Sequence, residues 1–340
     1  MRIKVGLIGI GDIFIDHMDA LKANPEFELV SICRRSKEKV SEQANQLGCK
    51  GFTNYRDLLA ECPDVVAITL PHALHCKTTI EALEAGCHVI VEKPMAISVD
   101  ECRQMLRCMD KCGKHLIVAE SASFNPAAVL TGQKFKTGQL GAFLTGSIIN
   151  SRFYFIESRP AWFLEPTMSG GGMFANIGVH RLAIARAALP GLMPISVCAS
   201  VRHVPKYTIE ACTSAIVKYK DYGAMFYEEI GYFPKPSWLN DGTHFIFENG
   251  IVSWDNATWR MMRQDGKIVE ETLIPNSVAY APVYANMLRA IRGQDYGPKA
   301  WEYAVDTIIT QAAYASSNKG CQIDLASEEW NIGCNNGTYQ

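Results

Sequence analysis

The sequence lacks several features that mark whole classes of protein. Its 12 cysteines include no C-x-x-C pair, which argues against a zinc knuckle. It has no basic excess or stripe of the kind nucleic-acid binders carry, since 33 Lys and Arg oppose 35 Asp and Glu. No uncharged apolar run reaches the ~18 residues of a membrane span, and no basic amphipathic helix suggests a membrane surface. We therefore expect no metal, no nucleic-acid partner and no membrane partner.

The N-terminal segment also lacks the pattern of a secretory signal. Residues 1–4 lead directly into an apolar strand pattern, and Asp12 and Asp16 follow within a few residues. A signal would need a longer apolar run and a cleavage site of small residues. We expect a cytoplasmic protein whose cysteines are reduced thiols, most of them filling the core.

What is present is the composition of an ordinary soluble globular protein. Apolar residues make up 48% and charged residues 20% of the 340 residues. These proportions exclude a disordered chain, a collagen and a coiled-coil rod. At about 150 residues per domain, the length predicts roughly two domains.

The first 120 residues alternate short apolar runs with helical patterns. The strands are expected at 3–8, 27–33, 65–68, 88–91 and 116–119, and the helices at 13–23, 36–47, 75–85 and 100–112. Such alternation, with β-branched buried strands, indicates a doubly wound parallel sheet covered on both faces. We assign 1–120 to a first domain built on such a sheet.

The pattern changes after residue 121. We expect a helix over 126–136, an extended stretch over 143–155, and a helix over 173–189 preceded by three glycines. Strands should follow over 196–274, with hairpin turns at 220–223 and at Asn249-Gly250. Two helices, from 282 to 293 and from 301 to 319, precede a polar tail. We assign 121–340 to an α+β domain with a large, mostly antiparallel open sheet.

A glycine-rich turn follows the first strand. It reads Gly9-Ile10-Gly11-Asp12-Ile13-Phe14, with Phe14 in place of the third glycine of the G-x-G-x-x-G pattern. Such glycines allow a tight turn and let backbone N–H groups approach a pyrophosphate at the helix N-terminus. The turn could also be only a turn, but its position favours nucleotide binding. The expected cofactor contacts here are Gly9, Gly11, Asp12, Ile13 and Phe14.

The end of the second strand bears on the choice of cofactor. NAD sites usually place a carboxylate here, whereas Cys33, Arg34, Arg35 and Ser36 offer none. An arginine can pair with a 2′-phosphate instead. The alternative is a solvated basic helix start. We expect NADP, with NAD as the alternative.

Two further segments resemble a known family. One runs from Leu70-Pro71-His72-Ala73-Leu74-His75 to Glu92-Lys93-Pro94, and the other is Gly170-Gly171-Gly172-Met173-Phe174-Ala175-Asn176-Ile177-Gly178-Val179-His180. Together with the N-terminal turn, they resemble the Gfo/Idh/MocA oxidoreductase family. The resemblance implies that 1–120 is a dinucleotide-binding Rossmann domain and that 121–340 is a substrate-binding and oligomerisation α+β domain, whose open sheet often mediates oligomerisation in the family. It also implies redox chemistry on sugars, cyclitols or related polyols with NAD(P). We accordingly expect a homo-oligomer, a dimer or a tetramer.

The same resemblance implies roles for single residues. Lys93 matches the family's catalytic lysine and His180 its catalytic histidine, while Leu70, Pro71, His72, His75, Glu92 and Pro94 fall in its cofactor-side segments. Two positions depart from the family pattern. The family's aspartate falls at Asn176, and Ser123 stands where many relatives have an arginine.

Oxidation of a secondary alcohol needs a base for the hydroxyl proton. Histidine has a suitable pKa with little tuning, and a lysine can stabilise the developing alkoxide. Asn176 and His180 are four residues apart and are expected on one helix face, but Asn176 cannot take a proton. Either Lys93 and His180 suffice while Asn176 orients the substrate, or activity has been lost. We favour the first reading because Lys93 and His180 both remain.

Other polar and aromatic residues have two readings each. Trp162 could stack on a sugar or simply pack, and we weigh the two equally. His72 and His75 form an H-x-x-H pair, for which structural or cofactor-side roles are favoured over a metal. The aromatic-rich stretch over 219–238 is expected to be sheet core or subunit interface.

Three functions remain distinguishable. The first is a hydride-transferring oxidoreductase acting on a sugar or polyol. The second is a glycoside-cleaving or epimerising enzyme that oxidises its substrate only transiently. The third is a non-enzymatic dinucleotide sensor, which the asparagine at 176 keeps open.

Overall fold

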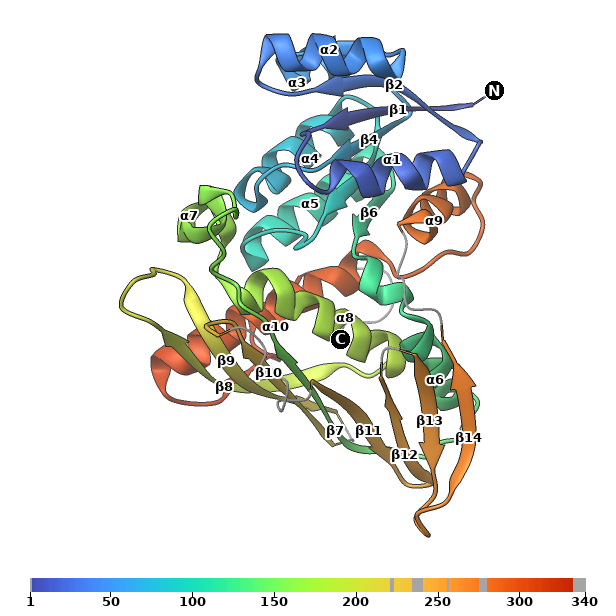
Figure 1. Ribbon diagram of the computed structural model, residues 1–340, viewed down its shortest axis with the longest axis vertical. Coiled ribbons are helices and arrows are strands. Elements are labelled where there is room, and N and C mark those ends of the chain that lie inside the picture. The colour runs from blue at the N-terminus through green and yellow to red at the C-terminus, as the bar shows by residue number, and fades with distance from the viewer. Residues whose placement is uncertain (1, 221–222, 234–240, 256, 275–279, 333–340) are drawn as a thin grey trace. The chain divides into compact units, whose positions relative to one another are not determined.

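The computed structural model describes residues 2–220, 223–233, 241–255, 257–274 and 280–332 (Figure 1). The chain forms two compact units. Unit 1 comprises Met1–Ser121, Ala279–Ala304 and Ile332–Gln340, and unit 2 comprises Ala122–Val278 and Val305–Asn331. Each unit contains one β-sheet, and the two units are described separately below.

Unit 1 contains a six-stranded sheet in the order β3-β2-β1-β4-β5-β6, with every neighbouring pair parallel. Its strands are β1 (Ile3–Ile8), β2 (Phe27–Cys33), β3 (Lys50–Phe52), β4 (Val65–Ile68), β5 (His88–Glu92) and β6 (Leu116–Ala119). This arrangement confirms the predicted doubly wound parallel sheet. The sequence prediction missed β3, which is too short to show a periodic pattern.

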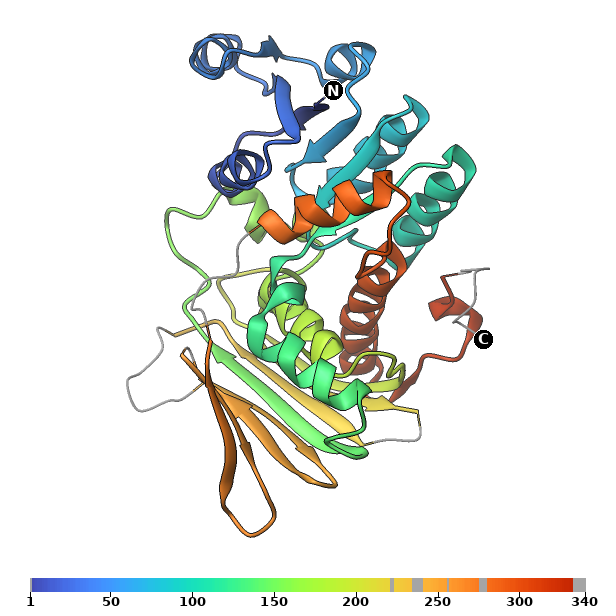
Figure 2. The same ribbon diagram turned by 90° about the vertical axis from the view of Figure 1, so that its right-hand side faces the viewer.

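The helices of unit 1 cover both faces of this sheet. They are α1 (Phe14–Ala23), α2 (Lys37–Leu47), α3 (Tyr55–Ala60), α4 (His75–Glu84), α5 (Val99–Cys112) and α9 (Ala281–Ile291). From β1 the chain adds β2 and β3 toward one edge of the sheet, and then β4, β5 and β6 toward the other edge. Because the crossover connections are right-handed, α1 lies on one face of the sheet and α4 and α5 lie on the other. Figure 2 shows this division of the helices. The helix α3 was also missed by the sequence prediction.

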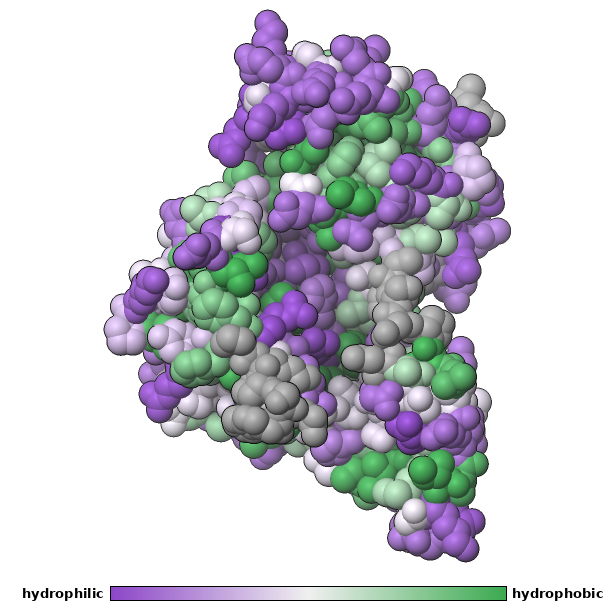
Figure 3. Space-filling view, in the orientation of Figure 1, coloured by the Kyte–Doolittle hydropathy of each residue, from purple (hydrophilic) through white to green (hydrophobic). Residues whose placement is uncertain are grey.

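Local signals in the sequence explain where several of these helices begin and end. Ser36 caps α2 by accepting a hydrogen bond from the Lys39 N–H, and Ser98 caps α5 in the same way through Glu101. Gly48 and Gly113 end these helices in the left-handed conformation, which glycine adopts without strain. Each serine cap stabilises its helix by about 1 kcal/mol. Figure 3 shows that the surface around α2 is mainly hydrophilic.

Helix α9 packs within unit 1 although it lies in the range 121–340. Its apolar side buries Val283, Tyr284 and Met287, and the helix contacts α1 and β6. The Rossmann sheet therefore takes part of its covering from a segment that follows β14, a strand of the second sheet, in the chain.

Unit 2 contains a nine-stranded sheet in the order β14-β13-β12-β11-β7-β10-β9-β8-β15. The strands are β7 (Phe143–Ser151), β8 (Pro194–His203), β9 (Glu210–Tyr219), β10 (Ala224–Ile230), β11 (Gly242–Phe247), β12 (Gly250–Trp254), β13 (Thr258–Met262), β14 (Ile268–Leu273) and β15 (Ile323–Asp324). Only β7 and β10 are parallel, while the other neighbours are antiparallel. The predicted mostly antiparallel sheet is confirmed, although β7 ends at Ser151 rather than at residue 155.

One face of this sheet is covered by helices (Figures 1 and 2). The covering elements include α6 (Pro126–Lys136), α8 (Val179–Ala188) and the unit 2 part of α10 (Ala300–Lys319), while a short helix, α7 (Pro166–Ser169), precedes the glycine segment. The Trp259 indole N–H donates to the Thr131 hydroxyl on α6 at 2.9 Å, and the Ser316 hydroxyl of α10 accepts from the Ala199 N–H on β8. These hydrogen bonds satisfy polar groups where helix and sheet meet.

The predicted hairpin at Asn249-Gly250 is present, with Phe247 of β11 opposite Gly250 of β12. The predicted turn at 220–223 and the aromatic stretch over 219–238 fall partly on residues 221–222 and 234–240, outside the described residues. Among the residues that the structure describes, no helix combines the length and apolarity needed to cross a bilayer. The same residues contain no cluster of three or more His, Cys, Asp or Glu able to hold a metal ion.

Candidate functional site

The glycine turn after β1 has two glycines with different environments. Gly9 has φ of +98°, and a Cβ there would lie 2.6 Å from the Thr69 carbonyl oxygen. Only glycine tolerates both the backbone conformation and this close approach. A Cβ at Gly11 would meet nothing within 4 Å. Gly9 therefore shapes the turn, whereas Gly11 leaves open space beside the backbone.

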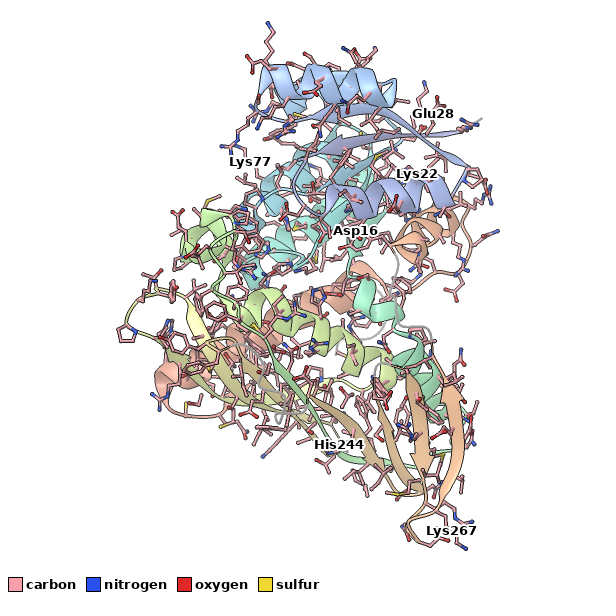
Figure 4. The ribbon with its side chains drawn as sticks, in the orientation of Figure 1. Asp16, Lys22, Glu28, Lys77, His244 and Lys267 are labelled. Carbon is pink, nitrogen blue, oxygen red and sulfur yellow. The ribbon has the colours of Figure 1, made fainter. Side chains whose placement is uncertain are left out.

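The same turn leads into the N-terminus of α1. The N-cap position is Ile13, whose aliphatic side chain cannot cap a helix, and Phe14 donates its N–H to the Gly11 carbonyl at 3.1 Å. Figure 4 shows α1 with Asp16, in its first turn, and Lys22, in its last. Helix N-termini with free N–H groups bind phosphate anions. This turn fits the pyrophosphate of a dinucleotide, and Asp12 is exposed beside it.

Some residues at the end of β2 hold the local structure, and others can contact a cofactor. Burial raises the pKa of the Cys33 thiol to about 11, so this side chain carries no charge at neutral pH. Ser36 is engaged as the cap of α2, and Arg34 donates to the Gln43 side chain at 2.7 Å. Arg35 is exposed. The two guanidinium groups are thus the candidates for contact with a ribose or a 2′-phosphate.

His75 connects the loop after β4 to the loop after β5. Its ring is fully buried, with Nδ1 2.9 Å from the Pro94 carbonyl oxygen and Nε2 2.8 Å from that of Leu70. Burial lowers the pKa of this imidazole, so the neutral ring donates to one of the two carbonyls at a time. The ring of His72 lies 5.7 Å away, centroid to centroid. His75 therefore holds together two loops that we expect to face the cofactor.

The Glu92-Lys93-Pro94 segment begins at the last residue of β5. Glu92 is 7% exposed, and its side chain accepts a hydrogen bond from the Lys93 backbone N–H at 3.2 Å. Its other oxygen lies 3.1 Å from His17 Nε2 on α1. The Lys93 side chain is half-buried. A buried carboxylate thus fixes the backbone that carries the expected catalytic lysine.

In unit 2, the three-glycine segment is held by a residue that the sequence analysis missed. Glu210 of β9 accepts from the Gly172 N–H at 2.5 Å, the Phe174 N–H at 2.9 Å and the Tyr314 hydroxyl at 2.7 Å. Burial is the largest influence on this carboxyl and raises its pKa. The available signal was an acidic residue in the apolar stretch Ile209-Glu210-Ala211, because a buried carboxyl group needs hydrogen-bond partners.

The segment expected as one helix over 173–189 has a different start. Residues Phe174–Gly178 form a π-helical turn, and α8 begins only at Val179. Such turns are rare and are frequent at functional sites. Asn176 lies in the π turn and His180 at the second position of α8, where it is half-buried. The expected single regular helix was therefore wrong in its first turns.

Asn176 is held by Tyr154. The Asn176 amide nitrogen donates to the Tyr154 hydroxyl at 3.0 Å, and the asparagine is 2% exposed. Burial raises the pKa of the Tyr154 phenol to about 12. The Arg159 guanidinium lies 4.0 Å from the centre of the Tyr154 ring, and its Nε donates to the Tyr154 carbonyl at 2.6 Å. The asparagine at this position thus has a defined orientation.

Two other predicted positions have identified neighbours. Trp162 is half-buried and stacks on Phe163, with ring centroids 3.7 Å apart. Ser123, at one of the departures from the family pattern, lies 3.4 Å from a nitrogen of Arg186, which also binds Asp306 at 2.8 Å. A guanidinium from α8 therefore reaches Ser123, the position at which the sequence departs from the family pattern.

The predicted site residues divide between the units. The glycine turn, the end of β2, the loop carrying Leu70 to His75, and Lys93 belong to unit 1, whereas Trp162, Asn176 and His180 belong to unit 2. Within unit 1, His75 links the β4 and β5 loops directly. The meeting of Lys93 and His180 beside one nicotinamide stays a prediction.

Two family models match the chain. Residues 3–120 match the model of the oxidoreductase family with an NAD-binding Rossmann fold, and residues 132–253 match the GFO/IDH/MocA C-terminal domain. A dTDP-3,4-didehydro-2,6-dideoxy-alpha-D-glucose 3-reductase of Streptomyces violaceoruber is 36% identical, over 91% of this chain and 92% of that protein.

A D-glucoside 3-dehydrogenase of Escherichia coli is 29% identical over 55% of this chain and 54% of that enzyme. Several of the matched relatives are thus aligned over only about half to two thirds of their length. The fold resembles that of levoglucosan dehydrogenase, solved with NADH and levoglucosan, with a TM-score of 0.84 and 19% identity over 96% of this chain and all of that one.

Proposed function

The chain belongs to the Gfo/Idh/MocA oxidoreductase family, and from this premise we propose that it transfers a hydride between a nicotinamide cofactor and a sugar-type substrate. The reacting group would be a secondary hydroxyl or ketone of a sugar, cyclitol or related polyol. The observation that carries the proposal is the Lys93 backbone fixed by buried Glu92, at the carboxyl end of a parallel sheet that also presents the glycine turn. The names of the relatives above, which are sugar dehydrogenases and a sugar reductase, support the substrate class.

The residues present fit a dinucleotide. Gly11 opens space beside the turn, and the N–H groups at the start of α1 have no side-chain cap at Ile13. The nicotinamide, when bound, supplies or accepts the hydride. Lys93 would stabilise the alkoxide oxygen of the substrate with its ammonium group, and His180 would take the hydroxyl proton. Asn176, oriented by Tyr154, would bind a substrate hydroxyl without exchanging protons.

We favour NADP over NAD as the cofactor. Arg34 and Arg35 supply positive charge at the end of β2, and the neutral Cys33 thiol supplies no carboxylate for a ribose 2′-OH. A guanidinium pairs well with a phosphate dianion. The existing contact of Arg34 with Gln43 would hold its guanidinium near this strand end.

We also propose that the open sheet of unit 2 forms a homo-oligomer. Leu144, Ile195 and Ile216 are 49%, 41% and 43% exposed, although all three lie on strands of this sheet. Exposed apolar side chains of this kind mark protein–protein contacts when they lie together. Light scattering of the purified protein would measure the mass, and a monomer at micromolar concentration would contradict the proposal.

The decisive experiment is a panel of polyols and keto-sugars assayed with NADP(H) and NAD(H), with nicotinamide absorbance as the readout. We expect turnover of at least one sugar-type substrate in the purified protein. Product formation without net cofactor turnover would instead indicate the glycoside-cleaving or epimerising alternative. Tight cofactor binding with no turnover of any substrate would indicate a dinucleotide sensor.

A further inference from the structure

A chain of buried polar side chains in unit 1 joins α1, the end of β5 and α9. His17 of α1 is fully buried, with Nε2 3.1 Å from a Glu92 oxygen and Nδ1 2.9 Å from the Tyr284 hydroxyl of α9. Tyr280, beside the start of α9, hydrogen-bonds to Glu92 as well. The proposed chemistry does not use His17, Tyr280 or Tyr284.

The direction of each hydrogen bond follows from what the groups can donate. A carboxylate only accepts, so the His17–Glu92 hydrogen bond is donated by Nε2 of the imidazole. Burial, together with the charge of Glu92, raises the pKa of both tyrosines, so their hydroxyls remain donors. Glu92 thus accepts from His17, from Tyr280 and from the Lys93 N–H.

The rings around His17 restrict its movement. Its centroid lies 5.1 Å from that of Tyr280 and 5.8 Å from that of Tyr284, both in edge-to-face geometry. Phe27 of β2 packs edge-to-face on Tyr284 at 5.5 Å. The imidazole is therefore held on its edges by hydrogen bonds and around its plane by aromatic rings, so that a small shift of α1 displaces Glu92.

His17 also lies in the first turn of α1, three residues after Phe14. That turn is the one whose N–H groups fit a pyrophosphate. The backbone of this turn therefore leads from the expected phosphate contact to His17, and the His17 side chain is linked through Glu92 to the Lys93 N–H.

We infer that His17 is a positioning residue that sets the place of Lys93 through Glu92 and couples it to cofactor binding at the start of α1. The inference rests on the proposed function of Lys93. An apolar side chain could fill the same space, but it would leave a buried Glu92 oxygen and the Tyr284 hydroxyl without the hydrogen-bond partner that His17 provides, at a cost in stability. What it could not supply is a donor aimed at the Glu92 oxygen.

The test uses three replacements that separate donor position from volume. In His17→Gln the amide nitrogen can reach the position of Nε2 and still donate to Glu92. In His17→Asn it reaches only the position of Nδ1, and His17→Leu supplies no donor. We expect roughly 10- to 100-fold lower kcat in the Asn and Leu variants, with a KM for the sugar changed by less than about threefold. The Gln variant should retain most of the activity.

A second readout does not require turnover. Hydrogen exchange of the peptide containing Lys93 should be slow, and slower still with NADPH, in the wild type and His17→Gln. It should be faster and insensitive to NADPH in His17→Asn and His17→Leu. Equal exchange in all four proteins, or equal kcat in the Gln and Asn variants, would overturn the inference. The expected exchange pattern in a protein without any turnover would keep the inference and reject the proposed function.

Discussion

Two buried glutamates, one in each unit, serve the same physical purpose by different means. Glu92 in unit 1 accepts from one backbone N–H and from two side chains, His17 and Tyr280. Glu210 in unit 2 accepts from two backbone N–H groups and from Tyr314. Each carboxylate anchors a loop that carries expected site residues.

The difference lies in what each anchor is attached to. Glu92 is adjacent in sequence to the group it positions, whereas Glu210 acts on a glycine segment 38 residues away. A motif can therefore reveal the first anchor, while the second appears only when β9 and the glycine segment are brought together. Buried charges of this kind must be hydrogen-bonded to persist, so both mark places where the backbone position matters.

The largest effect should come from removing the group that Glu92 positions. Lys93→Ala should lower kcat roughly 10³-fold, because the substrate oxygen loses its nearby positive charge. Cofactor binding, measured by fluorescence titration, should stay close to wild type. Lys77, exposed on α4 (Figure 4), is the matched control, and Lys77→Ala should leave kcat unchanged. Unchanged turnover in Lys93→Ala would remove this lysine from the mechanism.

Replacing Glu210, the anchor in unit 2, should mainly lower the stability of the protein. In Glu210→Gln, three donors meet a side chain with a single acceptor oxygen, so at least one buried N–H or O–H loses its partner. We expect the free energy of unfolding to fall by about 2–4 kcal/mol in urea titrations. Tyr314→Phe, which removes one donor and leaves the carboxylate in place, should cost about 1 kcal/mol. A Gln variant as stable as the wild type would show that this carboxylate is not an anchor.

The contrast between the two anchors also explains which parts of the structure can be predicted from the sequence and which cannot. Strand and helix positions in unit 1 follow from apolar runs and from caps such as Ser36 and Gly48, which act locally. The packing of α9 on unit 1 and the fixing of Asn176 by Tyr154 depend on contacts between distant residues. The π turn at Phe174–Gly178 has no counterpart in the helical periodicity, and its close contacts with Glu210 appear only in three dimensions.

The cofactor assignment in unit 1 predicts an intermediate effect. NADPH should bind more tightly than NADH to the wild type, and Arg34→Ala should reduce the preference about tenfold or more by removing a guanidinium from the 2′-phosphate. Calorimetric titration with both cofactors would measure the difference. Arg107→Ala, at an exposed position on α5, serves as the charge-matched control. Equal affinities for both cofactors in the wild type would refute the phosphate-binding role.

The smallest effect is expected at the substrate side of unit 2. In Asn176→Asp the hydrogen bond to Tyr154 can persist with its direction reversed, because the phenol keeps its proton and can donate to the carboxylate. The local fold should therefore be retained. The new carboxylate can orient the imidazole of His180 and raise its basicity, so kcat should be preserved or rise by up to about tenfold. A loss of about 100-fold in kcat with unchanged stability would show instead that the amide N–H of Asn176 binds the substrate itself, which an aspartate cannot reproduce.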